Sequence, residues 1–265
     1  TIVKMNNDCF LGAKLTEINI PKSVVEISAW AWSAMYETPK CKVEDGNTKF
    51  ESDSDGALYA KGKKALRCIP SKIMGTGGNN TYTVNSAVDT IYVNAFNAIA
   101  NLKKVVLPQN LKFVQELYPS IATGTDLVEF VLPDGGNTNY RVEGGVLFNN
   151  VTKTLVCYPR AKDTKEYTVP DDIKRIAPFA MMVTLHMTSL NLNHVTKLER
   201  SALYKPQKLE TITIPKELTK SGLVDGAFEE CVKLKAYEVA TGNPDFSAEG
   251  GVLFSKNKTK LCYYP

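Results

Sequence analysis

Apolar residues recur along this chain at a nearly constant spacing. Residues 209–240 (LETITIPKELTKSGLVDGAFEECVKLKAYEVA) hold one complete unit, which reads Leu-x-x-apolar-x-apolar-Pro and then, about a dozen residues later, Ala-Phe-x-x-Cys-x-x-Leu. The ends of successive apolar segments keep this spacing: 23 residues separate Val169 from Leu192, 22 separate Leu192 from Ile214, and 25 separate Ile214 from Val239. A period of about 20 to 29 residues is typical of solenoids, in which each repeat packs on its neighbours.

Each unit predicts one strand and one short turn. In Leu-x-x-apolar-x-apolar the last two apolar positions alternate at the strand period, so both point into the core and the residues beside them point outward. The proline that follows cannot donate to the ladder and therefore ends the strand. The Ala-Phe segment is long enough for one helical or 3₁₀ turn with Phe and Cys on its inner face. The predicted fold is an α/β, mostly β solenoid: a right-handed leucine-rich repeat stack with a parallel strand ladder.

Three blocks of a different kind interrupt the repeats, at about residues 47–70, 137–159 and 243–265. Each contains an aromatic residue, a turn with Gly-Gly or with an acidic residue and Gly, and two apolar runs around a polar turn, the second run ending in Pro. Such runs around a polar connector are a β-hairpin signal. We therefore predict hairpin modules inserted into a single solenoid that spans residues 1–265, with ordinary repeats resuming at residues 81–85 (TYTVN) and 166–170 (EYTVP).

The strand register also predicts which side chains face outward along the ladder. These positions carry small and polar residues, with little charge and no aromatic ring, and they form the candidate binding face. Its residues are Glu17, Asn19, Lys104, Glu129, Glu166, Thr168, Ser189, Asn191, Thr211, Thr213 and Glu238. The alternative interpretation is a sheet face that only contacts solvent.

Composition narrows the classes of partner. The net charge is +4, and no basic run is longer than Lys63-Lys64 or Lys103-Lys104, which argues against a nucleic-acid interface. No apolar run approaches the roughly 18 residues of a membrane span. The chain begins TIVKMNNDCF, without an initiator Met or an apolar leader, so we expect a mature or trimmed fragment whose signal peptide or lipid anchor has been removed.

The sequence contains few residues in an arrangement typical of a catalytic or metal-binding site. The six cysteines (Cys9, Cys41, Cys68, Cys157, Cys231 and Cys262) are even in number, which permits disulfides, but they are widely spaced and form no C-x-x-C pair, so free and mostly buried thiols are expected. The two histidines, His186 and His194, lie in one repeat without a catalytic motif and are interpreted as surface or cap residues. No cofactor and no metal site are predicted.

Two segments imitate ligand loops. Glu51, Asp53, Asp55 and Gly56 alternate like the start of a calcium loop, but the twelfth position is Gly62, where such a loop needs Glu, so a turn is the better interpretation. Residues 75–78 (GTGG) lack a following Lys-Ser or Lys-Thr and are interpreted as a flexible connector rather than a phosphate loop.

The sequence of the repeats resembles that of a known family. Ile-Pro-x-x-Leu…Gly-Ala-Phe-x-x-Cys-x-x-Leu at residues 214–234 and Gly-Gly-Val-Leu-Phe…Leu-x-Cys-Tyr-Pro at residues 144–159 are similar to the BspA-like leucine-rich repeat family. The chain departs from that pattern at Met35, Ile99, Gly124 and Pro206, where Cys is usual, and at Trp32 and Leu203, where Phe is usual. The resemblance implies a surface or secreted protein of Bacteroides-type bacteria, often a lipoprotein, that adheres to host proteins or other cells.

The expected function is therefore a non-catalytic recognition or adhesion module that binds a host matrix or cell-surface protein. One alternative is a structural spacer that displays another domain. Another is a glycan binder or hydrolase, for which the ladder offers only scattered carboxylates at Glu17, Glu129, Glu166 and Glu238. Because terminal repeats need capping, we expect that the last hairpin caps the stack, that the natural chain continues beyond Pro265, or that it dimerises there.

Overall fold

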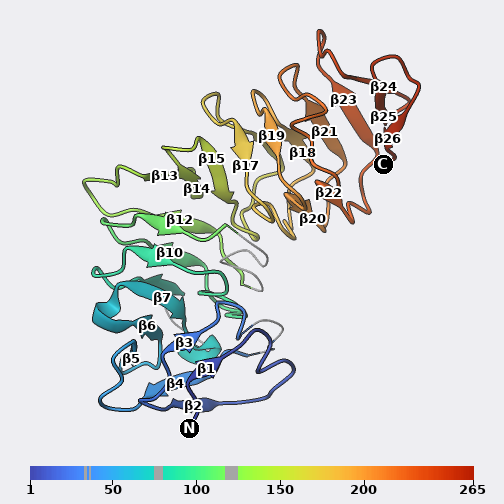
Figure 1. Ribbon diagram of the computed structural model, residues 1–265. Helices are drawn as coiled ribbons and strands as arrows, with labels where there is room; N and C mark the ends of the chain where they lie inside the picture. The colour runs from blue at the N-terminus through green and yellow to red at the C-terminus, as the bar shows by residue number, and fades with distance from the viewer. Residues whose placement is uncertain (33–34, 36, 75–79, 117–124) are drawn as a thin grey trace. The chain divides into compact units, whose positions relative to one another are not determined.

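The computed structural model describes residues 1–32, 35, 37–74, 80–116 and 125–265. The predicted connector at residues 75–78 and the repeat position Gly124 lie outside these residues. The chain divides into two compact units, Thr1–Gly145 and Val146–Pro265, which are described separately (Figure 1). The single solenoid across residues 1–265 stays a prediction, whereas the mostly β solenoid class is confirmed in each unit.

The 146–265 unit contains three parallel ladders, because each turn of its chain contributes up to three short strands. The first ladder comprises β16 (Glu166–Thr168), β18 (Ser189–Asn191), β21 (Thr211–Ile214) and β23 (Ala236–Val239). The second comprises β15 (Thr154–Cys157), β17 (Arg175–Ile176) and β19 (Lys197–Leu198), and a bridge extends it from Leu198 to Leu223. The third pairs β20 (Leu203–Tyr204) with β22 (Phe228–Glu229).

The 1–145 unit repeats the first two of these ladders in pieces. Its first-ladder strands are β2 (Glu17–Ile20) with β4 (Lys40–Val43), and β8 (Thr81–Thr83) with β10 (Lys104–Val106) and β12 (Glu129–Val131). Its second-ladder strands are β1 (Lys4–Met5) with β3 (Glu26–Ile27), and β7 (Ala65–Cys68) with β9 (Thr90–Ile91) and β11 (Phe113–Val114). The second ladder explains the apolar residue six positions after the proline that follows a first-ladder strand, such as Ile27 after Pro21 and Val114 after Pro108, to which the sequence pattern assigned no element.

The predicted hairpins are present as pairs of antiparallel strands. They are β6 (Leu58–Ala60) with β7, β14 (Val146–Asn149) with β15, and β25 (Val252–Ser255) with β26 (Leu261–Tyr263). A further strand precedes each hairpin: β5 (Phe50–Ser52), β13 (Tyr140–Glu143) and β24 (Phe246–Glu249). Since β5 pairs with β6 and β24 pairs with β25, the first and third modules are three-stranded meanders.

A buried asparagine opens the first and third modules and joins each of them to the preceding repeat. The Asn243 side-chain amide donates to the carbonyl oxygens of Pro215 and Leu218 at 2.7 and 3.0 Å, and its Oδ1 accepts from the amides of Asp245 and Phe246 at 2.9 and 2.8 Å. Asn47 forms the same four bonds in the first module, and Asn137 forms an equivalent set before the second. One side chain thus satisfies four backbone groups that strand pairing leaves open.

A glycine brings each module against the first ladder. The carbonyl oxygens of Gly56, Gly145 and Gly251 accept from the amides of Cys41, Phe130 and Tyr237 at 2.8–2.9 Å. All three glycines have φ between +82° and +88°, and a Cβ there would approach the neighbouring strand to within 2.8 Å. The Gly turn in the sequence pattern is therefore a close backbone approach as well as a turn.

The expected helical turn at the Ala-Phe segment is wrong. Phe228–Glu229 is a strand, and within the described residues the helices are two 3₁₀ turns, Lys61–Lys63 and Ser71–Ile73, neither long enough to cross a membrane. The carbonyl oxygens of Gly226, Ala227 and Glu229 accept from the preceding repeat, from the amides of Ser201, Leu203 and Lys205. Because the backbone bonds between repeats, the segment stays extended rather than closing a bond within itself.

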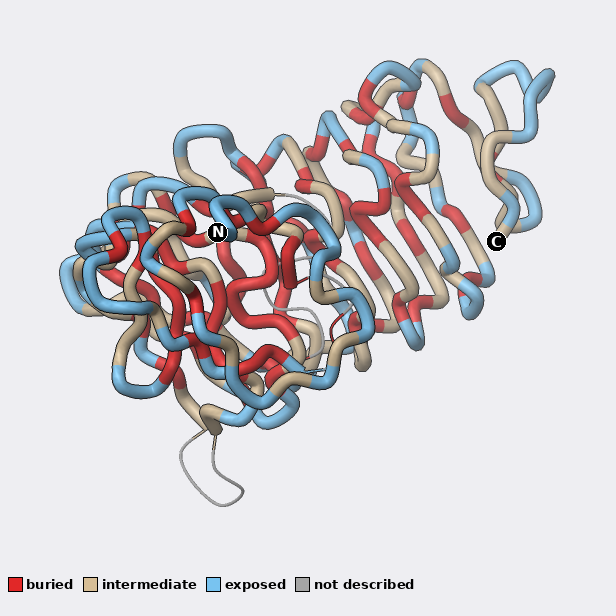
Figure 2. Tube along the Cα trace, turned by 60° about the horizontal axis from the view of Figure 1, so that its bottom comes forward, coloured by how far each residue is buried: buried red, intermediate tan, exposed pale blue. Residues whose placement is uncertain are grey.

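The core of each unit lies inside its turns, as the buried residues in Figure 2 show. Leu190 and Ile212, which are neighbours in the first ladder, are fully buried. The residues that depart from the family's sequence pattern also pack in the core: Trp32, Met35, Ile99, Leu203 and Pro206 are all buried. These replacements keep apolar bulk in the core, which explains why the repeat tolerates them.

A partly buried ion cluster spans the second ladder at Glu199. Its Oε1 accepts from Arg175 Nε at 2.8 Å and lies 2.8 Å from Lys197 Nζ, and the Glu199 side chain is 16% exposed. Burial acts to raise the pKa of Glu199, but the hydrogen bonds from Lys197 and Arg175 outweigh it and lower the pKa. The ionised carboxylate therefore stabilises the folded state.

We expect Glu199→Gln to reduce the free energy of unfolding by about 1 kcal/mol near neutral pH, the contribution of a charge-assisted hydrogen bond. A lowered carboxyl pKa gives stability that is present above the ordinary value of 4.5 and is lost as pH falls through the folded value. Urea unfolding at about pH 7 and about pH 3 should therefore show a smaller pH dependence in the variant. Glu210→Gln, which breaks the exposed Lys235–Glu210 pair, is the control and should change little. Equal effects of the two variants would contradict this assignment.

Candidate functional site

The first ladder of the 146–265 unit aligns seven of the predicted face residues in two rows. The strands β16, β18, β21 and β23 are parallel and in register. One row contains Glu166, Ser189, Thr211 and Ala236, and the other contains Thr168, Asn191, Thr213 and Glu238. Residues spaced 22 to 25 apart in sequence thereby become neighbours about 4.8 Å apart.

Strand alternation places these side chains outside. Between the two rows lie Tyr167, Leu190, Ile212 and Tyr237, of which the last three are at most 3% exposed. The row residues are all exposed or half-buried, as in β21, where Thr211 and Thr213 alternate with buried Ile212 and Ile214. The predicted outward direction is therefore confirmed for this ladder.

Hydrogen bonds hold the second row in place. Thr213 Oγ1 donates to Glu238 Oε2 at 3.1 Å, and Asn191 Oδ1 accepts from the amide of Asn193 at 2.8 Å. The Asn193 side-chain amide donates in turn to Asp171 Oδ1 at 2.6 Å and to the Val169 carbonyl at 2.9 Å. The face thus combines short side chains with fixed positions, and it has a carboxylate at two of its corners.

The sequence interpretation missed Asn193 and Asp171, which extend the second row. A signal was available: Asn193 follows its strand at the position where other repeats have Pro21, Pro108 or Pro215. Asn193 adopts a positive φ of 52°, which Asn tolerates and Pro cannot adopt.

The four remaining face residues lie in the 1–145 unit, on two separate sheets. Lys104 and Glu129 are cross-strand neighbours, and their Nζ and Oε1 atoms form an ion pair at 2.6 Å. Glu17 and Asn19 on β2 lie opposite Lys40 and Lys42 on β4. Since both partners of the Lys104–Glu129 pair are about 40% exposed, the pair contributes little to stability.

The carboxylates of the ladder are too far apart for glycoside hydrolysis. Glu166 and Glu238 lie on the first and last strands of the four-stranded ladder, so three strand spacings, about 14 Å, separate their backbones. Hydrolysis needs two carboxyl groups about 5 to 9.5 Å apart. These two residues therefore do not form such a pair.

One of the two histidines contacts a carboxylate. His194 Nδ1 contacts Glu217 Oε1 at 3.0 Å, and both side chains are partly exposed. Burial acts to raise the pKa of Glu217, but the contact with His194, a backbone hydrogen bond and the charge of Lys216 together outweigh it and lower the pKa. His186 is half-buried, and among the described residues no three His, Cys, Asp or Glu side chains gather as a metal site would require.

The six cysteines are free. Cys41, Cys68 and Cys157 are buried, Cys231 and Cys262 are partly buried, and Cys9 is exposed. Burial raises the pKa of the Cys231 thiol to about 12 and also raises that of Cys68. A thiol with so high a pKa is protonated at neutral pH and is a poor nucleophile.

The calcium-like segment forms a turn around Asp53. Its Oδ1 accepts from the amides of Asp55 and Ala57 at 3.1 and 2.9 Å, and its Oδ2 accepts from the Tyr59 hydroxyl at 3.0 Å. Both carboxylate oxygens therefore stabilise the turn itself.

The chain is similar to proteins of known structure and to one sequence family. The profile of the BspA type leucine-rich repeat region matches six copies, in residues 1–54, 63–140 and 157–249. A leucine-rich repeat protein from Eubacterium ventriosum superposes with a TM-score of 0.56 at 17% identity over 89% of this chain, which spans 57% of that protein's length. The pneumococcal vaccine antigen PcpA superposes with a TM-score of 0.51 at 15% identity over 92% of this chain and 69% of its own. No curated protein matches the sequence.

Proposed function

The chain belongs to the BspA-type leucine-rich repeat family, and from that premise we propose that it is a non-catalytic recognition module with its binding face on the first ladder of the 146–265 unit. The partner is a protein of the host matrix or of a cell surface. We place the protein outside the cytoplasm, secreted or attached to the outer cell surface, as the family resemblance implies.

The observation that carries this proposal is the pair of in-register rows on β16, β18, β21 and β23. Ser189, Thr211, Asn191 and Thr213 offer hydroxyl and amide groups that both donate and accept hydrogen bonds. Their side chains are short, so fixing them against a partner costs little conformational entropy. The two strands that carry them, β18 and β21, pair with a strand on each side and bury Leu190, Ile212 and Ile214 beneath the rows, which supports a rigid platform.

The glycan alternative has less support. Sugar rings bind preferentially against exposed aromatic faces, and the rows contain none, since the Tyr237 ring packs in the core against Phe228 at 5.4 Å. A structural spacer needs no binding face at all, so it is the outcome of a negative binding experiment.

The test is binding of the purified chain to an array of extracellular-matrix proteins and gut glycans. We expect a protein ligand whose binding falls by at least about tenfold in a variant with Asn191→Arg, Thr211→Arg and Thr213→Arg, because long cations exclude a partner from the rows. The matched control places the same three charges elsewhere in the unit, with Val151→Arg, Val232→Arg and Asn257→Arg, at exposed positions. The control should bind like the parent chain.

Two results would overturn the proposal. Equal loss in both triple variants would show that added charge, rather than the ladder, determines binding. A folded chain that binds nothing on the array would favour the spacer.

A further inference from the structure

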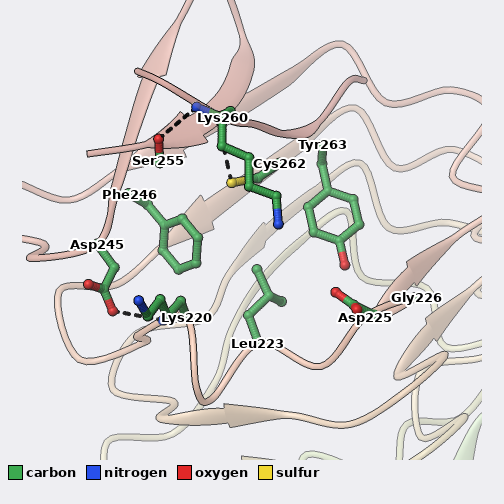
Figure 3. A pocket seen from close by; sticks show the side chains of 10 residues that line it. All are labelled: Lys220, Leu223, Asp225, Gly226, Asp245, Phe246, Ser255, Lys260, Cys262 and Tyr263. Carbon is green, nitrogen blue, oxygen red and sulfur yellow. Dashed lines mark hydrogen bonds between the residues drawn. The ribbon is translucent and has the colours of Figure 1, made fainter. Parts of the chain in front are cut away.

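A pocket of about 310 Å³ opens in the 146–265 unit, away from the ladder residues (Figure 3). The loop at residues 219–226 forms one wall and the β24–β26 meander forms the other. Its volume is at the lower end of the range of small-ligand sites.

Two local changes in the repeat create this pocket. The apolar residues that lead into the second ladder are three apart in other repeats, as in Leu111 and Val114, but Leu218 and Leu223 are five apart. The two extra residues form a wider turn, in which the Leu223 amide donates to the Thr219 carbonyl at 3.1 Å. The loop that forms this wall is therefore longer than the corresponding segment of those repeats.

The third module also lacks a group that fills this space in the second. In the 1–145 unit the Tyr140 hydroxyl accepts from the Val114 amide at 2.8 Å and is buried. Phe246 occupies the position of Tyr140, three residues after the module asparagine, and it has no hydroxyl to reach Leu223.

The walls of the pocket are apolar at the base and charged at the rim. Phe246 is buried and Leu223 is half-buried, and the Tyr263 ring lies on the opposite side (Figure 3). The Lys260 side chain extends between the rings of Phe246 and Tyr263, with its ammonium directed into the space, and Asp225 lies at the far side.

The charges at the rim differ in their availability. Asp245 is engaged, because its Oδ2 accepts from the Lys220 amide at 2.9 Å and thereby ties the loop to the meander. The Lys260 ammonium forms no ion pair with any described residue. A ligand anion would therefore meet Lys260, and a ligand N–H would meet Asp225.

We propose that this pocket binds an apolar residue with a free carboxylate, either the C-terminal residue of a peptide or a free amino acid. The side chain packs against Leu223, Phe246 and Tyr263, the carboxylate pairs with Lys260, and the backbone nitrogen donates to Asp225. This pocket shares no residue with the binding face on the first ladder, so an experiment can contradict one proposal and leave the other standing.

The probe is N-acetyl-leucine, with N-acetyl-leucine amide as the uncharged match. Cys262 lines the pocket and Cys9 is exposed in the other unit, so alkylation by iodoacetamide, followed by mass spectrometry, provides a site and an internal reference. We expect the acid to slow alkylation of Cys262 and not of Cys9, and calorimetry to give an affinity for the amide about tenfold weaker.

Lys260→Met keeps the apolar stem and removes the charge, and it should weaken binding of the acid by about tenfold. Lys260 is exposed, so the variant should unfold at the parent temperature. Lys256→Met, in the same turn but outside the pocket, is the control. Equal binding of acid and amide, equal binding by Lys260→Met, or no protection of Cys262 at millimolar probe overturns the proposal. If the acid binds as expected, the affinities of a leucine-terminated peptide and of free leucine are compared, and the tighter ligand shows whether the pocket binds a peptide C-terminus or a free amino acid.

Discussion

Replacing Asn243 with leucine is expected to lower the free energy of unfolding of the 146–265 unit by about 3 kcal/mol or more. Leucine has nearly the same volume but cannot donate to the carbonyl oxygens of Pro215 and Leu218 or accept from the amides of Asp245 and Phe246. Because Asn243 is 1% exposed, water cannot replace these partners without local unfolding. Four backbone groups would stay buried without a bond.

Hydrogen exchange gives the sharpest measurement of this effect. The Phe246 amide, which donates to Asn243 Oδ1, should exchange much faster in the variant, and urea unfolding should begin at a lower concentration. Asn257→Leu is the matched control, because Asn257 accepts three hydrogen bonds in the exposed turn before β26 and water can replace them. A loss in Asn257→Leu as large as that in Asn243→Leu would contradict the structural role of burial.

Replacing Gly251 with alanine is expected to lower the free energy of unfolding by about 3 kcal/mol. The same change at the adjacent Gly250 is expected to lower it by only about 1 kcal/mol. Both glycines have positive φ, +82° and +56°. A Cβ at Gly250 meets nothing within 4 Å, whereas a Cβ at Gly251 would lie 2.7 Å from the Lys235 carbonyl oxygen and 3.1 Å from Ala236 Cα. The module would have to move away from β23 and lengthen the 2.8 Å bond from the Tyr237 amide to the Gly251 carbonyl.

The two adjacent glycines separate the effect of the positive φ from the effect of the close approach to the neighbouring strand. Thermal and urea unfolding of Gly250→Ala and Gly251→Ala, together with hydrogen exchange of the Tyr237 amide, measure these two effects. If the two variants lost equal stability, backbone conformation alone would account for the glycines and the close approach would be irrelevant. Gly56→Ala and Gly145→Ala should behave like Gly251→Ala, since a Cβ at either position would lie 2.8 Å from the neighbouring strand.

Much of the candidate face was predictable, because it depends on a local rule. A strand that buries Ile212 and Ile214 must expose Thr211 and Thr213, whatever the rest of the chain does. The relation between rows was also predictable, since a repeat of 22 to 25 residues brings equivalent positions side by side. The extension through Asn193 and Asp171 was not, because it depends on a side-chain bond between repeats.

The sequence by itself determined the period, the first ladder, the place of the modules and the inward or outward direction of strand residues. These follow from the spacing of apolar residues within one repeat. Only the tertiary structure decided that the Ala-Phe segment is extended, that Asn243 joins a module to Pro215, and that a pocket opens beside Lys260. Each of these depends on which backbone or side-chain groups of neighbouring turns contact each other. The spacing of apolar residues within one repeat does not predict those contacts.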